Sequence, residues 1–168
     1  MTKPNAKRIT KTLLRERYRR SFTIPHYTPK DWWECDVFEL TKAGYFREYE
    51  IKVTKRDFLA DAAKFQAGPV WKAGKLNKAV GSKHGLLEGK HVCGPAQFWF
   101  VTPEGMLTLD EVPWWAGLIE VSYRRKRWRE REVKKAPRLH DTKLDAEVVQ
   151  HAVGVCYYRL VNKILAEK

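Results

Sequence analysis

The 168-residue chain has only three cysteines and no long apolar run, and each absence excludes a class of protein. Cys35, Cys93 and Cys156 are an odd number without paired spacing, which favours reduced thiols over a disulfide framework. No stretch is apolar for long enough to predict a membrane span or the core of a signal peptide. We therefore expect a cytoplasmic protein.

Two common ligand-binding signatures are also missing. No glycine-rich segment has the G-x-x-x-x-G-K-S/T spacing that cradles nucleotide phosphates. His91 and Cys93, or His151 and Cys156, do not extend to a four-ligand set with the spacing of a zinc site. The sequence thus predicts neither a phosphate-binding loop nor structural zinc.

Acidic residues are scarce relative to basic ones. Lysine and arginine total 33 against 20 aspartates and glutamates, for a formal net charge of +13. Hydrophobic residues make up 43% of the chain and aromatic residues 12%, which is typical of a folded domain and not of a basic tail. The excess charge favours a polyanionic partner, most commonly nucleic acid, although ribosomal and membrane-surface proteins share this balance.

Two strands joined by a short turn are predicted near the middle of the N-terminal half. Segments 35–40 and 45–53 are rich in Val, Ile, Phe and Tyr, as strands are. Residues 42–44 form a three-residue loop between them, with Gly44 at the position that needs a positive φ. This loop sets the register and predicts that Asp36 lies opposite Glu50.

The predicted register brings three charged side chains together. Because side chains alternate along a strand, Glu50 and Lys52 share one face, and Asp36 joins them from the neighbouring strand. Two converging carboxylates repel each other and favour a bound cation, and hard oxygen ligands suit Mg²⁺ or Mn²⁺. Lys52 could then orient a water or stabilise charge on a phosphate. A solvated surface ion pair is the plain alternative.

A helix is expected directly after these strands. Thr54 followed by Asp57 resembles a capping box, and the apolar residues that follow recur at helical spacing: Phe58, Leu59, Ala62 and Phe65. We also predict a short N-terminal helix over 9–18, strands at 97–101 and 117–123, and a long helix over 141–168.

Basic residues concentrate in two further segments. Residues 67–96 form an insertion rich in glycine and lysine, in which we expect a DNA-contacting loop that carries Lys72, Lys75, Lys78 and Lys83. The second segment, 124–129, contains an embedded tryptophan and the basic side chains Arg124, Arg125, Lys126 and Arg127. A solvated loop and a solvated hairpin tip are the respective alternatives.

These motifs together resemble the PD-(D/E)XK nuclease superfamily, in particular its MmcB-like DNA-repair branch and bacteriophage relatives. The resemblance rests on Asp36, the hairpin, Glu50-Ile51-Lys52 and the run from Thr54 to Asp61. A second match comprises Phe98-Trp99-Phe100-Val101-Thr102-Pro103-Glu104-Gly105, then Glu111-Val112-Pro113 and Gly117-Leu118-Ile119-Glu120-Val121. The basic insertion and the extended C-terminal part depart from the family pattern.

The resemblance implies a role for each residue of the motif. Asp36 and Glu50 would bind Mg²⁺ or Mn²⁺, the carbonyl of Ile51 would be a further ligand, and Lys52 would be the catalytic lysine. Members of the family often add an acid from the N-terminal helix, for which Glu16 is the best-placed candidate here.

We therefore expect an α/β protein with one nuclease-like domain over residues 1–168. The expected core is restriction-endonuclease-like, with a central mixed sheet flanked by helices, plus a long C-terminal helix. The expected activity is metal-dependent hydrolysis of DNA in repair, recombination or phage DNA processing, in a bacterium or a phage-infected host cell. A non-catalytic nucleic-acid-binding protein on this fold and a nuclease for structured RNA are the alternatives. Endo- versus exonuclease action and a homodimeric state are left open.

Overall fold

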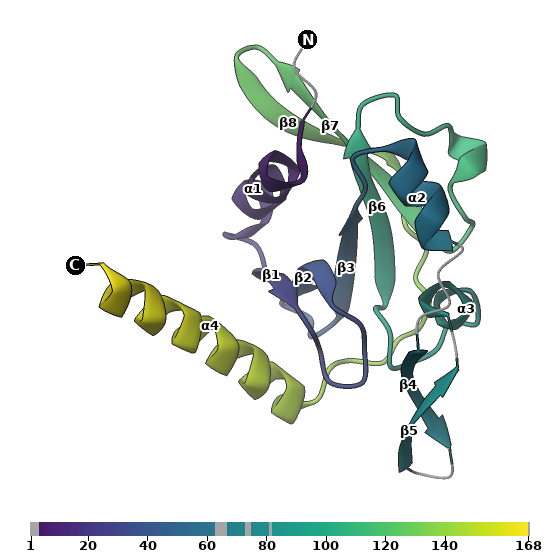
Figure 1. Ribbon diagram of the computed structural model, residues 1–168, viewed down its shortest axis with the longest axis vertical. Coiled ribbons are helices and arrows are strands. Elements are labelled where there is room, and N and C mark those ends of the chain that lie inside the picture. The colour runs from purple at the N-terminus through teal and green to yellow at the C-terminus, as the bar shows by residue number, and fades with distance from the viewer. Residues whose placement is uncertain (1–3, 63–66, 73–74, 81, 168) are drawn as a thin grey trace.

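The computed structural model describes residues 4–62, 67–72, 75–80 and 82–167, with the backbone alone for 62, 67–72 and 75–80. Figure 1 shows the arrangement of the elements. In chain order they are α1 (Ala6–Arg17), β1 (Phe22–Tyr27), β2 (Cys35–Leu40), β3 (Phe46–Ile51), α2 (Lys55–Ala62), β4 (Ala67–Lys72), β5 (Lys75–Val80), α3 (Lys83–Glu88), β6 (Gln97–Pro103), the 3-10 turn η1 (Leu109–Glu111), β7 (Ala116–Arg124), β8 (Arg127–Lys134) and α4 (Ala146–Ala166).

Six strands form one mixed sheet in the order β1-β2-β3-β6-β7-β8. The central pairs β3–β6 and β6–β7 are parallel, and the outer pairs β1–β2, β2–β3 and β7–β8 are antiparallel. Strands β4 and β5 form a separate two-stranded hairpin. The sheet is flanked by helices, with the long α4 at the C-terminal end, so the predicted α/β fold class is confirmed.

The β2–β3 hairpin has the predicted register. Gly44 adopts a φ of +87°, and the Thr41 N–H donates to the Tyr45 carbonyl at 3.0 Å. The pairs run from Leu40 opposite Phe46 to Val37 opposite Tyr49. The next step along both strands places Asp36 opposite Glu50, so the turn geometry inferred from the sequence sets the facing positions.

Each face of the sheet carries its own apolar core. On one face, Phe38, Phe46, Phe98 and Phe100 pack with residues of α2, α3 and α4. On the other face, side chains from β2, β3, β6 and β7 pack against α1: Ile9, Leu13, Val37, Tyr49, Trp99, Val101, Ile119 and Val121. Figure 1 shows α1 on the opposite side of the sheet from α2 and α3. Because both faces are covered, successive residues of the central strands are buried alternately on either side.

Several elements differ from the sequence expectation. Segment 67–96, expected to be a loop, contains the β4–β5 hairpin and α3, and strands β1 and β8 were not predicted. Helix α4 begins at Ala146, where the Asp145 carboxylate caps it by accepting from the Val148 N–H at 2.8 Å. Thr54 Oγ accepts from the Asp57 N–H at 3.1 Å, as the expected cap requires, whereas Phe65 lies outside the described residues.

A bilayer crossing needs a helix of about 20 predominantly apolar residues. Within the described ranges, none of the helices combines such length with such apolarity. This agrees with the absence of a long apolar run in the sequence.

Gly117 is required by close packing between β6 and β7. A Cβ atom at this position would lie 2.6 Å from Nε1 of Trp99 and 2.7 Å from the backbone nitrogen of Ala136. We predict that Gly117→Ala lowers the free energy of unfolding by about 1–3 kcal/mol, because a rigid ring and backbone must move. Urea denaturation measures this, with Ser122→Ala on the same strand as a control expected within about 0.5 kcal/mol of wild type. Equal stability of the two variants would contradict the close approach.

Candidate active site

The three predicted residues meet where β2 begins and β3 ends, on the face covered by α2 and α3. Glu50 is the second-last residue of β3, and Lys52 follows the last residue, Ile51. Because side chains alternate along a strand, the side chains of Glu50 and Lys52 both lie on this face. Asp36 Oδ2 accepts a hydrogen bond from the Ile51 N–H at 2.7 Å. The carboxylate of Asp36 is thereby fixed to the backbone between Glu50 and Lys52.

Glu50 lies between two lysines. Its Oε1 is 2.9 Å from Nζ of Lys52, and its Oε2 is 2.8 Å from Nζ of Lys83, which comes from the start of α3. The three side chains are between 9% and 13% exposed, so these ion pairs are largely shielded from water. Because the pairs are buried, removing one partner destabilises the fold far more than it would in a surface pair.

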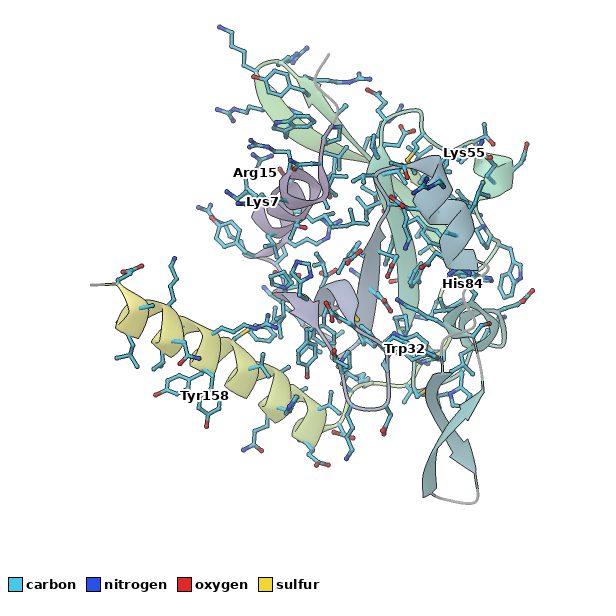
Figure 2. The ribbon with its side chains drawn as sticks, in the orientation of Figure 1. Lys7, Arg15, Trp32, Lys55, His84 and Tyr158 are labelled. Carbon is cyan, nitrogen blue, oxygen red and sulfur yellow. The ribbon has the colours of Figure 1, made fainter. Side chains whose placement is uncertain are left out.

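The pairing continues in both directions. Nζ of Lys83 also lies 2.5 Å from Glu48 Oε1, and Trp32 Nε1 donates to Glu48 Oε2 at 2.7 Å. At the other end, Nζ of Lys52 lies 2.9 Å from Asp61 Oδ1, and Asp61 Oδ2 lies 3.2 Å from Nε2 of His84. We call the alternating series the ionic row: Glu48, Lys83, Glu50, Lys52, Asp61 and His84. Figure 2 labels Trp32 and His84, which mark its two ends.

The surroundings determine which of these groups are charged. Burial raises the pKa of Glu50, but the ammonium groups of Lys83 and Lys52 outweigh burial and the net shift is downward. Burial lowers the pKa of Lys52, but Glu50 and Asp61 outweigh it and raise the pKa overall. Glu50 is therefore a carboxylate and Lys52 an ammonium ion at neutral pH, which suits Lys52 to stabilise negative charge and not to act as a base.

Asp36 and Glu48 are the two acids held less firmly in the charged form. Burial and the charge of Glu50 raise the pKa of Asp36, and the Ile51 N–H offsets this only in part. Burial raises the pKa of Glu48 to about 7, against the charge of Lys83, which lowers it. Burial is the largest cause of both shifts, and the charge of Glu50 adds to it.

The donor set fits a divalent cation with few protein ligands. Four carboxylates (Asp36, Glu48, Glu50 and Asp61) face the two ammonium groups of Lys52 and Lys83. The acids thus outnumber the lysines, and a divalent cation such as Mg²⁺ or Mn²⁺ would offset the excess. Among the described residues no three His, Cys, Asp or Glu side chains converge on one point. The available ligands are thus Asp36, Glu50 and the Ile51 carbonyl, in keeping with the preference of Mg²⁺ for one or two carboxylates.

The lysines expected to contact DNA do not form one group. Lys83 is buried in the ionic row instead of lying in an exposed loop. The side chains of Lys72, Lys75 and Lys78 lie outside the described part of the chain.

The second basic segment forms the tip of the β7–β8 hairpin. Arg124 pairs with Arg127 across the strands, with Arg125 and Lys126 as the exposed two-residue turn. The Arg124 guanidinium also forms an ion pair with Glu104.

Sequence reasoning missed four members of the site: Glu48, Asp61, Lys83 in this role, and His84. Glu48 could have been found, because it precedes Glu50 by two residues and alternation places it on the same face. Asp61 follows Thr54 by two helical turns, but its orientation depends on how α2 packs. Lys83 and His84 come from a segment whose path the sequence pattern does not define.

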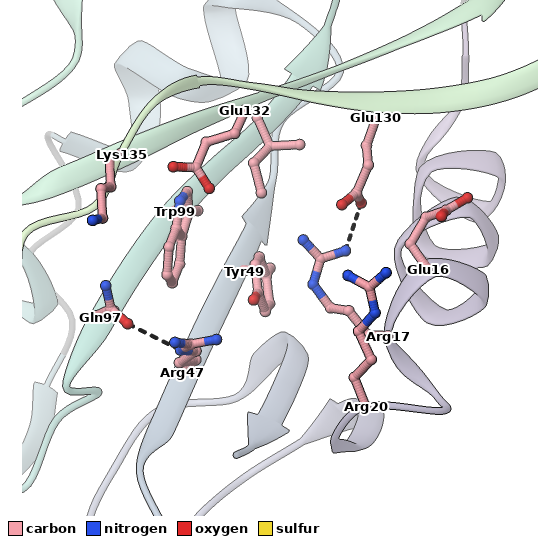
Figure 3. Close-up of a pocket in the computed structure, with 11 residues that line it drawn as sticks. Glu16, Arg17, Arg20, Arg47, Tyr49, Gln97, Trp99, Glu130, Glu132 and Lys135 are labelled. Atoms are coloured by element: carbon pink, nitrogen blue, oxygen red, sulfur yellow. Dashed lines mark hydrogen bonds and ion pairs between the residues drawn. The ribbon is translucent and has the colours of Figure 1, made fainter. Parts of the chain in front are cut away.

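A cavity of about 340 Å³ lies on the opposite face of the sheet from Glu50 (Figure 3). The rings of Tyr49 and Trp99 stack there at 5.2 Å, and the Arg17 guanidinium lies 4.4 Å from the centre of the Tyr49 ring. Arg17 also pairs with Glu130 at 2.5 Å. Glu16 lines this cavity, so the structure places the acid expected from the N-terminal helix on the other side of the sheet from Glu50.

Comparison with known proteins finds no matching family model and no matching curated protein. Among solved structures, SPO1766 from Silicibacter pomeroyi, a protein of unknown function, has a similar fold, with a TM-score of 0.64 and 17% sequence identity. The match covers 98% of this chain and 96% of that protein. At this identity the likeness shows a shared fold and carries no information on activity.

The ionic row generates a stability prediction. We expect Lys83→Met to lower the free energy of unfolding by about 3–5 kcal/mol, because it leaves Glu48 and Glu50 buried without their shared cation. The double variant Lys83→Met/Glu48→Gln should recover part of this loss, since one uncompensated charge is removed. Urea denaturation of wild type, Lys83→Met, Glu48→Gln and the double variant gives the coupling energy between Lys83 and Glu48.

A matched control is Lys55→Met, which removes a lysine that is 54% exposed and paired with Glu111. This change should alter stability by less than about 1 kcal/mol. Similar losses for Lys55→Met and Lys83→Met, or additive effects in the double variant, would show that the row does not stabilise the fold as inferred.

Proposed function

We propose that the protein is a Mg²⁺- or Mn²⁺-dependent nuclease of the PD-(D/E)XK type that hydrolyses DNA phosphodiester bonds. The observation that carries the proposal is the meeting of Asp36, Glu50 and Lys52 at the start of β2 and the end of β3, where buried acids outnumber the lysines that pair with them. Two carboxylates with an adjacent protonated lysine match the needs of phosphodiester hydrolysis.

Each side chain has a distinct task in this proposal. Asp36, Glu50 and the Ile51 carbonyl would hold the metal ion, which would polarise the scissile phosphate. Lys52, held between Glu50 and Asp61, would place a positive charge against the phosphate oxygens as negative charge develops on them. Glu48 and Lys83 would fix the orientation of Glu50. Water supplies the attacking oxygen and the proton that the leaving oxygen takes up.

The β7–β8 turn supports a polyanionic substrate independently. Arg125 and Lys126 have φ values of +48° and +62°, and a two-residue turn with two positive φ values strongly prefers Asn-Gly. L-residues with long side chains are strained there by about 1 kcal/mol each. Two exposed cations at strained positions are better explained by contact with phosphate than by stability.

One observation favours the non-catalytic alternative. Both carboxylate oxygens of Glu50 already contact ammonium groups, so a metal ion must share Glu50 with Lys52 and Lys83. If Glu50 stays bound to both lysines and takes up no metal ion, the protein would bind nucleic acid without cleaving it. Structured RNA presents the same backbone charge, and so RNA substrates belong in the same test.

We predict that Asp36→Asn lowers metal-dependent cleavage by at least about a hundredfold while DNA affinity is retained. The amide oxygen of Asn can still accept from the Ile51 N–H, so the fold is preserved and only the charge is removed. The measurement is cleavage of labelled single-stranded, duplex, flap and junction DNA and of hairpin RNA, with Mg²⁺, Mn²⁺ or EDTA.

Glu16→Gln is the matched control, because it removes a carboxylate on the opposite face of the sheet, and it should cleave like wild type. Undiminished cleavage by Asp36→Asn would overturn the assignment of the site. Tight binding by wild type without cleavage of any substrate in either metal would favour the non-catalytic alternative.

A second prediction concerns the hairpin tip. Replacing Arg125 by Asn and Lys126 by Gly should raise the free energy of unfolding by about 1–2 kcal/mol, because the new residues suit the turn. The same double variant should bind DNA more weakly, and the slope of log affinity against log salt should fall by about 1 for each phosphate group that the variant no longer binds.

Lys42→Ala/Lys163→Ala provides a control with the same change of charge away from the hairpin, in the β2–β3 loop and on α4. Fluorescence anisotropy over a salt series and urea denaturation compare the two double variants. If both lower the salt slope equally, the tip makes no specific contribution and only net charge matters.

A further inference from the structure

Helix α4 contacts the rest of the protein along one narrow stripe. Val148 and Ala152 are buried, and His151 Nδ1 is hydrogen-bonded to the Tyr27 hydroxyl at 2.9 Å. Farther along, the Arg159 guanidinium donates to the carbonyls of Pro25 and His26 at 2.6 and 2.5 Å. Positions 148, 152 and 159 are four and seven residues apart, one and two helical turns, and so lie on one side of the helix, with 151 beside them. Figure 1 shows the helix running outward past β1, with its C-terminal end far from the sheet.

The opposite side of α4 is apolar and open to solvent. More than half of the surface of each of the following side chains is exposed: Val153, Tyr157, Tyr158, Leu160, Ile164 and Leu165. Figure 2 shows Tyr158 directed away from the sheet. Between Glu147 and Lys163 the helix has no acid, and its two basic side chains, His151 and Arg159, are bound to β1. In a chain that is 32% charged, such an uncharged exposed face indicates an interface.

The pattern on this face is that of a helix-pairing seam. Gln150, Gly154, Tyr157, Val161 and Ile164 recur at alternating steps of four and three residues, with Val153 and Leu160 on one flank and Tyr158 and Leu165 on the other. Alternating steps of this kind align side chains for packing between two helices. We call these residues the α4 seam.

Gly154 indicates how closely the partner approaches. A glycine inside a helix lowers stability by about 1 kcal/mol relative to alanine, and a Cβ here would meet no atom within 4 Å. The protomer itself therefore gives no reason for the missing side chain. An approaching side chain from another molecule does, because it would fill the space above Gly154.

We propose that the α4 seam binds the same seam of a second copy of the chain in an antiparallel pair. The surface is self-complementary: Gly154 leaves a hole, and the Tyr157 ring, 62% exposed, projects one turn away. With a two-fold axis between these positions, Tyr157 of each copy fills the hole at Gly154 of the other. An isologous contact needs such a patch, and the opposed helix dipoles add a favourable term. The 21-residue helix, about 31 Å long, offers several turns of contact.

Sedimentation velocity tests the proposal directly. Wild type should sediment as a dimer at about 100 µM and dissociate on dilution. Gly154→Leu fills the hole in both copies and should raise the dissociation constant at least tenfold, about 1.4 kcal/mol. Because the leucine meets nothing in the protomer and favours helix, the monomeric variant should keep its far-UV circular dichroism and melt no lower than monomeric wild type.

Asn162→Leu is the matched control, since it adds the same side chain to α4 outside the seam and should leave the dimer unchanged. A monomeric wild type at about 100 µM would overturn the proposal. So would a Gly154→Leu variant that dimerises like wild type, because the pair could then not pack at this glycine. Neither result depends on cleavage, so this test stands apart from that of the proposed nuclease activity.

Discussion

The ionic row is the interaction on which the candidate site depends. It joins three separate parts of the chain, because Glu50 belongs to β3, Asp61 to α2 and Lys83 to α3. A buried charge without its partner destabilises a fold by several kcal/mol, so each member requires the next. The row thus fixes the crossover helices on the sheet and fixes the carboxylate of Glu50 with them. Replacing all its members by apolar residues would hold the helices equally well, which indicates that the charges serve another purpose than stability.

The sequence predicted the part of this arrangement that local geometry controls. A loop of known length with Gly44 at its positive-φ position sets the register, and the alternation of side chains along each strand sets which face they occupy. The meeting of Asp36 with Glu50 therefore follows from residues close in the chain. Lys83 could not be found in this way. It lies more than thirty residues beyond Glu50, and its burial is decided by how α3 packs. From sequence alone, a lysine among glycines is expected to be exposed. Its burial can be inferred only once the buried acid that it pairs with is known.

The two faces of the sheet both bury charged groups but differ in how these charges are compensated. Tyr49, between Glu48 and Glu50 in sequence, points to the α1 face, where its hydroxyl hydrogen-bonds to the buried Glu39. Arg17 lies against that ring and pairs with Glu130. Both faces therefore bury charged groups, but on the α1 face arginine compensates the acids locally. On the face where Asp36 and Glu50 meet, by contrast, the described acids outnumber the lysines that pair with them.

The edges of the sheet show how both proposals fit one molecule. A bare edge strand invites pairing with another chain, and proteins block it with charge, proline or a covering element. At the β1 edge, Pro25 lacks a donor and its carbonyl accepts from Arg159 of α4. At the β8 edge, Arg127, Arg129 and Arg131 alternate with other residues and leave the strand basic. These edges are the two ends of the strand order. A second copy bound through α4 would therefore lie at one edge of the sheet, and nucleic acid bound at the β7–β8 hairpin would lie at the other. The end of β3, with Glu50 and Lys52, belongs to a central strand of this order, so neither edge contact involves the strand that carries the candidate site.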